Sequence, residues 1–225
     1  MPDDLRPRSN VVGAGLKPAL VDSLISFHSN ETQHMVHDHS VRSHPRISLH
    51  GIERLQGYDY SQSGAYFLTL CVNGRSHLFG EVLDATMHLN HFGRIVQTCW
   101  TDLSNHYRHI SLDAFTVMPN HIHGILFLER GPTTEQQHGV PEIVRALKTF
   151  SARRINEQRG SRGSSVWQRN YFEHIIRDER ALDRIREYIL DNPRRWSVDR
   201  ENTLREGHDE FDRWIESFPA PAKHR

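Results

Sequence analysis

The chain has 225 residues, in which 28 lysines and arginines balance 28 aspartates and glutamates. This length suits one compact domain with tails, and the zero net charge lends little support to nucleic-acid binding, because such domains are often basic. No apolar run approaches the length of a membrane span and the N-terminus lacks a signal-peptide core, so we expect a soluble cytoplasmic protein without a membrane partner. Cys71 and Cys99 form neither a disulfide framework nor a CxxC pair, which fits a reducing compartment.

Composition divides the chain into three regions. Residues 1–45 are polar and rich in histidine, and the absence of a strict histidine spacing favours a disordered, solvated arm over a metal-binding tract. Sequence patterns typical of strands and helices begin near Arg46, so we expect one domain over 46–196. Residues 197–225 are expected to form a C-terminal tail with no more than weak amphipathic character.

The first part of the folded region predicts strands around one helix. Apolar runs rich in β-branched and aromatic residues predict strands, and apolar residues at helical spacing predict a helix. In chain order we predict a strand at 64–72, a hairpin of 78–83 with 86–89, a helix capped by Asn90 and reaching about Tyr107, and neighbouring strands at 110–118 and 121–129.

The second part predicts two more helices with a strand between them. Proline is favoured in the first turn of a helix, and the residue before a proline resists the α conformation. We therefore predict a helix beginning at Pro141, a fourth strand within 166–176, and a last core helix from Asp178 to Asn192-Pro193. This order predicts an α+β fold, a ferredoxin-like or RRM-like antiparallel sheet with helices packed on one side.

His121 and His123 begin one of the predicted strands, directly after Pro119-Asn120. Side chains alternate across a strand, so both imidazoles point to one face, while Ile122 and Gly124 point to the other. Two imidazoles on a rigid strand are well placed to share a metal ion, although a bare HxH pattern also fits two polar residues on a solvent-facing surface.

Tyr188 and Asn192 lie four residues apart on the last predicted helix and therefore on one face. A boundary tyrosine and a simple helix terminator would account for either residue alone. Together with His121 and His123, however, they predict a tyrosine nucleophile beside a metal site. A phenol has a pKa near 10 and needs an activated electrophile, and a divalent cation on a scissile phosphate provides one. The amide oxygen favours Mg²⁺ or Mn²⁺, while the nitrogen ligands leave zinc open.

A set of motifs in this order resembles the HUH-type single-tyrosine transposases, and within them the REP-associated tyrosine transposases. The motifs are GYDY at 57–60, GAYF at 64–67, LFG at 78–80, NHFGRIV at 90–96, MPNHIHG at 118–124, WQ at 167–168, FEH at 172–174 and YILDNP at 188–193.

The resemblance implies roles for four residues. His121 and His123 match the paired metal ligands, Tyr188 matches the nucleophile, and Asn192 matches the third ligand position. It also implies an activity, which is cutting and rejoining single-stranded DNA through a 5′-phosphotyrosine. The implied partner is single-stranded DNA with hairpins or palindromic repeats, and the enzyme would act as a monomer or homodimer.

Arginine dominates the positive charge between 145 and 195, which suits contacts to phosphate or guanine. Arg153 and Arg154, followed by a Gly/Ser loop, are the expected hairpin contacts, and Arg184 lies one turn before Tyr188. Each of these arginines alone also fits a solvated helix face.

Alternative hypotheses concern the chemistry and the nucleophile. A non-catalytic DNA- or RNA-binding module would keep the fold without cutting, and a phosphodiesterase using water would not need Tyr188. Tyr171 is the rival nucleophile, and His174 is a rival ligand or substrate contact, but their spacing does not form one helical face.

Overall fold

The structure, a computed structural model, describes residues 62–129 and 138–218; the predicted arm over 1–45 and the predicted start of the domain at Arg46 lie outside these ranges. In chain order the elements are β1 (Gly64–Cys71), η2 (Asn73–Arg75), β2 (Gly80–Leu83), β3 (Thr86–Leu89), α2 (His91–Thr101), α3 (Leu103–His106), β4 (Ile110–Val117), β5 (His121–Leu128), α4 (Val140–Gln158), β6 (Phe172–Ile176), α5 (Glu179–Asp191), η3 (Asn192–Arg195) and α6 (Glu210–Glu216).

The main sheet has four strands in the order β4-β5-β1-β6, and each neighbouring pair is antiparallel. With its intervening helices, this arrangement is the ferredoxin-like type, so the predicted α+β class is confirmed. β2 and β3 form a separate two-stranded sheet, as the predicted hairpin required.

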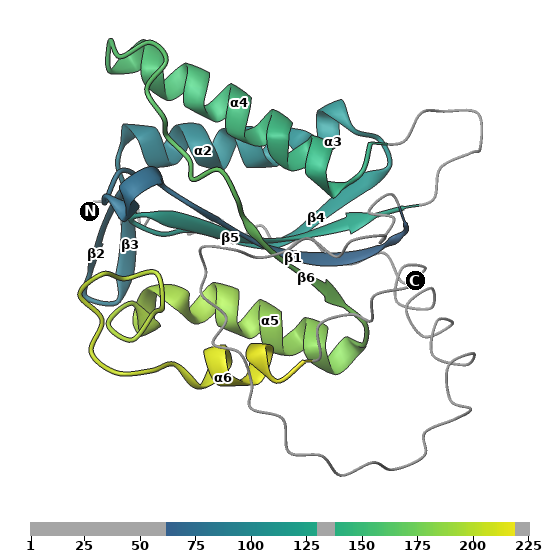
Figure 1. Ribbon diagram of the computed structural model, residues 1–225. Helices are drawn as coiled ribbons and strands as arrows, with labels where there is room; N and C mark the ends of the chain where they lie inside the picture. Colours follow the sequence, from purple (N-terminus) through teal and green to yellow (C-terminus); the bar gives the residue numbers. More distant parts are fainter. Residues whose placement is uncertain (1–61, 130–137, 219–225) are drawn as a thin grey trace, which may run out of the picture.

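Helices cover both faces of the main sheet, and the prediction that they pack on one side is wrong. Figure 1 shows α2 and α4 on one face and α5 and α6 on the other. The physical reason is the composition of β5, whose residues are all buried. Even-numbered residues of this strand such as Ile122 and Leu126 pack with α2 and α4, while Ile125 and Phe127 pack with α5 and α6.

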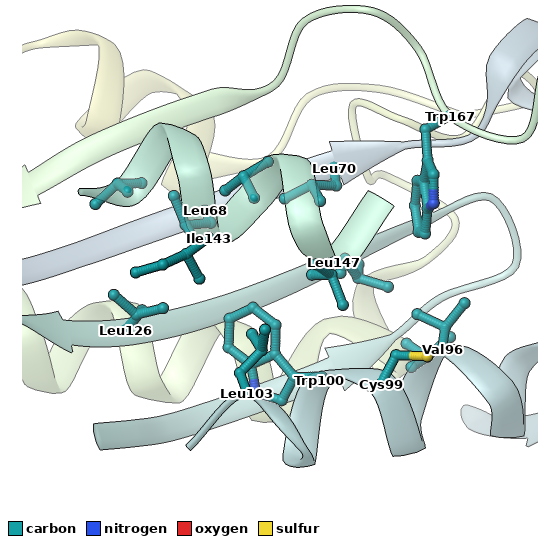
Figure 2. Packing of buried hydrophobic residues seen from close by; sticks show 14 of the residues in the cluster. Leu68, Leu70, Val96, Cys99, Trp100, Leu103, Leu126, Ile143, Leu147 and Trp167 are labelled. Carbon is teal, nitrogen blue, oxygen red and sulfur yellow. The ribbon is translucent and has the colours of Figure 1, made fainter. Parts of the chain in front are cut away.

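The core beneath α2 and α4 is built around Trp100 (Figure 2). Its indole stacks on Phe115 with ring centroids 4.7 Å apart and lies over Gly124 of β5. A Cβ at position 124 would come within 2.5 Å of the indole carbons, so glycine is required there for close packing. This contact fixes which face of β5 packs beneath α2 and α4, and therefore which face carries the histidines.

Local signals explain where most of the helices begin. Asn90 accepts a hydrogen bond from Gly93 N at 3.0 Å and caps α2, and Asp178 accepts one from Ala181 N at 2.8 Å and caps α5. Pro141 lies in the first turn of α4, as predicted. The helix predicted from Asn90 to Tyr107 is divided at Asp102 into α2 and α3.

The predicted fourth strand is shorter than the segment 166–176. It begins at Phe172, and before it Trp167 makes only an isolated bridge with Val72. The carbonyl oxygens of residues 168–170 accept hydrogen bonds from Lys148 Nζ at 3.0–3.3 Å, so this stretch follows α4 instead of extending the sheet ladder.

The segment after η3 returns to the sheet. Phe211 and Ile215 of α6 are buried in the same cluster as α5. The described part of the chain contains no helix that is both long and apolar enough to cross a membrane.

Candidate active site

His121 and His123 lie at the start of β5 and point toward α5. Their exposed fractions are 0% and 1%, and their Nε2 atoms are 3.0 Å apart. Two nitrogen ligands about 2.1 Å from one ion and at right angles to each other would also lie about 3.0 Å apart. The spacing of the two imidazoles therefore fits adjacent positions around a single metal ion.

Neighbouring side chains set the tautomers of the two histidines. Asn120 Nδ2 donates to the Glu201 carbonyl at 2.7 Å and to the Arg75 carbonyl at 3.3 Å, which leaves its Oδ1 facing His121 Nδ1 at 2.8 Å. His121 Nδ1 must therefore carry the proton. His123 Nδ1 lies 2.8 Å from Thr69 Oγ1, where the same tautomer fits. Both Nε2 lone pairs are then available to a metal.

Burial keeps both imidazoles neutral. It lowers the pKa of His121, against the nearby carboxylates of Asp199 and Glu201, which raise it. Burial, together with His121 and Arg200, lowers the pKa of His123 well below its usual value. Neutral imidazole is the form that binds metals, so the pair is prepared as ligands at neutral pH.

Tyr188 reaches this pair from the buried stripe of α5. Its hydroxyl lies 3.3 Å from His123 Nε2, and its ring stacks on Phe211 with centroids 3.6 Å apart. Only 2% of the residue is exposed. Burial raises the pKa of the Tyr188 phenol well above its usual value, and the carboxylates of Asp199, Asp212 and Asp209 add to the shift. In this conformation the phenol is protonated and shielded from solvent.

Asn192 follows one turn later and is completely buried. Its Nδ2 donates to Asp199 Oδ2 at 2.9 Å, while its Oδ1 has no hydrogen-bond partner among the described residues. A buried carbonyl oxygen without a partner is costly, and a cation would satisfy it. The free amide oxygen and the two Nε2 atoms thus fit the donor set of a divalent metal.

The structure brings Tyr188, His121, His123 and Asn192 into one site, but not the three arginines. Arg153 and Arg154 lie on α4, which covers the opposite face of the sheet. Arg184 lies on α5, with its guanidinium 4.5 Å from the centre of the Trp214 ring. The roles of these seven residues stay predictions.

The rival residues lie away from this group. Tyr171 packs against the core under α2 and α4, on the face opposite the histidine pair. His174 is on the same face as the pair but contacts Phe218, with ring centroids 4.9 Å apart. Within the described ranges, His121, His123 and Asp199 form the group of histidine and carboxylate side chains that could hold a metal ion. Their potential ligand atoms all lie within 4.8 Å of one another.

Sequence reasoning missed several contributors to the site, among them Thr69 beside His123. The sequence alone assigns Asn120 only to a turn, although its position next to His121 is a usable signal. Asp199 and Arg200 lie in the predicted tail, yet Asp199 is 1% exposed, and Arg200 lines a cavity with His123 and Tyr188. No spacing pattern in the sequence links these two residues to the histidines.

Comparisons with known proteins show what this chain is similar to. Residues 64–192 match the family model described as "Transposase IS200 like". An uncharacterized protein of Haemophilus influenzae is 36% identical over 160 residues, which cover 65% of this chain and 89% of that protein. Another protein of the same organism, described as a "putative REP-associated tyrosine transposase", is 29% identical over 144 residues, covering 60% and 73%. A solved structure of a REP-associated tyrosine transposase bound to a REP hairpin is 21% identical and covers 59% of this chain and 68% of that chain, with a TM-score of 0.44.

Proposed function

Because this chain belongs to the IS200-like transposase family, whose model matches more than half of its length, we propose that it cuts and rejoins single-stranded DNA through Tyr188. Membership agrees with the resemblance seen in the sequence motifs. The observation that supports Tyr188 as nucleophile is its hydroxyl, 3.3 Å from His123 Nε2, beside the two imidazoles that face each other. Conformational opening is needed first, since the residue is buried.

In the proposed cleavage, the Tyr188 oxygen forms a bond to phosphorus and the bond from phosphorus to the 3′ oxygen breaks. The phenol proton passes to solvent, and the leaving 3′ oxygen takes up a proton. The products are a 5′-phosphotyrosine and a free 3′-hydroxyl. Attack of another 3′-hydroxyl on the phosphotyrosine reverses the step and joins strands, so no external energy source is required.

His121, His123 and Asn192 are the proposed ligands of a divalent ion, Mg²⁺ or Mn²⁺. The partnerless Oδ1 of Asn192 and the two Nε2 atoms support this assignment. The bound ion would withdraw charge from the scissile phosphate and fix its position. Asn120 and Thr69 would hold the two imidazoles in the tautomer that presents Nε2.

The proposed substrate is single-stranded DNA containing hairpins or palindromic repeats, and the description of a relative as REP-associated supports this class. Arg153 and Arg154 would contact the hairpin, and Arg184 the strand near Tyr188. We place this activity in the cytoplasm, where the protein would act as a monomer or homodimer.

Trapping the covalent intermediate tests the proposal. Wild-type protein is incubated with single-stranded hairpin oligonucleotides and Mg²⁺ or Mn²⁺, and adducts are resolved on a denaturing gel and mapped by mass spectrometry. Tyr188→Phe should form no adduct and remain folded, because it loses only hydroxyl contacts of about 1 kcal/mol. Tyr171→Phe is the matched control and should form the adduct. An adduct on Tyr188→Phe would refute the nucleophile.

A non-catalytic nucleic-acid-binding module is the second candidate, and the burial of Tyr188 beneath Phe211 is the observation that favours it. The same assay separates the two functions. Stable binding of the oligonucleotides without any adduct, with either ion, would support the binding module over the transposase.

A further inference from the structure

Asp199 occupies the centre of the candidate active site although it comes from the C-terminal segment. Its Oδ2 accepts hydrogen bonds from Asn192 Nδ2 at 2.9 Å and from the Tyr188 hydroxyl at 3.4 Å, and it lies 4.0 Å from His121 Nε2. Its Oδ1 accepts from Glu201 N at 2.7 Å. One carboxylate thus touches the proposed nucleophile and faces the proposed metal ligands.

The charge of Asp199 has little compensation. The residue is 1% exposed, and no ion pair joins it to a lysine or arginine of the described ranges. A buried carboxylate is costly unless it is paired or coordinates a metal. The partnerless Oδ1 of Asn192, also fully buried, is an independent sign that a cation belongs at this position.

We propose that Asp199 is a further ligand of the metal in the DNA-free protein, and that metal binding thereby holds residues 199–216 closed over Tyr188. The inference rests on the metal site proposed above. A carboxylate oxygen is a preferred ligand of Mg²⁺ and Mn²⁺, and it would occupy a place that a phosphate oxygen of the DNA needs.

Further contacts make residues 199–216 a cover for the nucleophile. Phe211 stacks on the Tyr188 ring at 3.6 Å, and Glu201 binds Arg75 at 3.0 Å. If Asp199 is a metal ligand, metal binding and closure of residues 199–216 favour each other, because an ion that binds only the closed form stabilises that form. Opening of the segment is then the step that exposes Tyr188 to a DNA strand.

Binding of Mn²⁺ alone, without DNA, tests the inference on the full chain. Mn²⁺ affinity is measured by electron paramagnetic resonance, and closure is followed by hydrogen exchange of the backbone amides of residues 199–216. In the wild type, Mn²⁺ should slow this exchange. Asp199→Asn keeps the shape of the side chain and should bind Mn²⁺ at least about tenfold more weakly, with no slowing. Glu206→Gln, an equivalent change at an exposed position of the segment, should behave as the wild type.

A third variant separates this inference from the proposed function. If His121→Ala leaves Mn²⁺ affinity unchanged, the metal site itself is wrong. If His121→Ala abolishes binding while Asp199→Asn keeps wild-type affinity, only the role of Asp199 is overturned. Unchanged exchange of residues 199–216 in wild-type protein saturated with Mn²⁺ would also overturn it, and this measurement does not depend on any variant folding.

Discussion

Three histidines of this chain have pKa values that burial lowers. Burial, with the charge of Arg177 added, lowers the pKa of His174 to about 4, and burial also lowers the pKa values of His121 and His123. In the unfolded chain a histidine has a pKa near 6.5. The unfolded state therefore binds protons at a higher pH than the folded state, and acidification favours unfolding.

We accordingly expect the metal-free protein to lose stability as the pH falls from about 6.5 towards 4. The contribution is fully present above pH 6.5, because all these imidazoles are then neutral in both states. Urea denaturation in the presence of a chelator, at several pH values, measures the free energy of unfolding. His174→Gln should make this pH dependence shallower, while the exposed His91→Gln should keep the wild-type slope. Equal slopes for wild type and His174→Gln would contradict the role of burial.

The four site residues that the sequence predicts are those whose relative positions follow from local strand and helix geometry. The two-residue period of a strand is enough to place His121 and His123 on one face, and the four-residue spacing on a helix aligns Tyr188 with Asn192. Asp199 meets His121 across 78 positions of chain through a fold that no local pattern encodes. Its burial results from the return of the C-terminal segment to the sheet, which composition alone does not predict.

Among the elements, α5 positions the proposed nucleophile, and it is held at two points. Asp178 caps its first turn, and Arg186 makes paired 2.9 Å hydrogen bonds to both carboxylate oxygens of Asp113 on β4. Such bidentate contacts fix the orientation of the two side chains as well as the distance between them. Asp113 lies where the pairing of β4 with β5 shifts register, between Leu112 and Phe115.

Removal of the α5 cap should weaken the protein without changing its chemistry. We expect Asp178→Ala to lower the free energy of unfolding by about 1 kcal/mol, because Ala181 N loses its acceptor. Asp178→Asn keeps a side-chain oxygen and should stay close to the wild type. Urea denaturation provides the measurement, with Glu179→Ala as an exposed first-turn control. A loss no greater than that of the control would show that the cap contributes nothing.

Element boundaries were predictable where a residue type determines them. Asn90, Pro141 and Asp178 mark helix starts in the sequence and in the structure. Packing on one side was the wrong prediction because β5 mixes His121 and His123 with apolar residues on both faces, a pattern compatible with a sheet covered on either one face or two. Knowing the partners of its odd-numbered residues requires the position of α5.

For the whole molecule, a net charge of zero means that DNA must be attracted by local clusters of charge. Arg153 and Arg154 are exposed on α4, 75% and 51% by side chain, on the layer that does not carry Tyr188. A hairpin bound there would have to reach the catalytic layer around the edge of the sheet. Binding and chemistry would then depend on different faces.

The Arg153→Ala, Arg154→Ala double variant should therefore weaken binding of hairpin oligonucleotides and reduce its dependence on salt concentration. Each lost phosphate contact lowers the slope of log affinity against log salt by about 1. Fluorescence anisotropy over a salt series measures this slope, and adduct formation at saturating DNA should be unchanged. Arg108→Ala with Arg205→Ala removes the same charge from other exposed positions. An identical slope change in both double variants would indicate a non-specific charge effect.

The alternation of side chains along β5 also limits how this strand can pair with its neighbours. Ile122 faces the layer that holds Trp100, and its neighbour His123 faces the layer that holds Tyr188. A slip of one residue in the pairing of β5 with β1 and β4 would exchange the two surfaces and place both imidazoles in the apolar layer beneath α2 and α4. The apolar residues on both faces of β5 therefore do more than fill the core, because the register they hold is what keeps His121 and His123 opposite Tyr188.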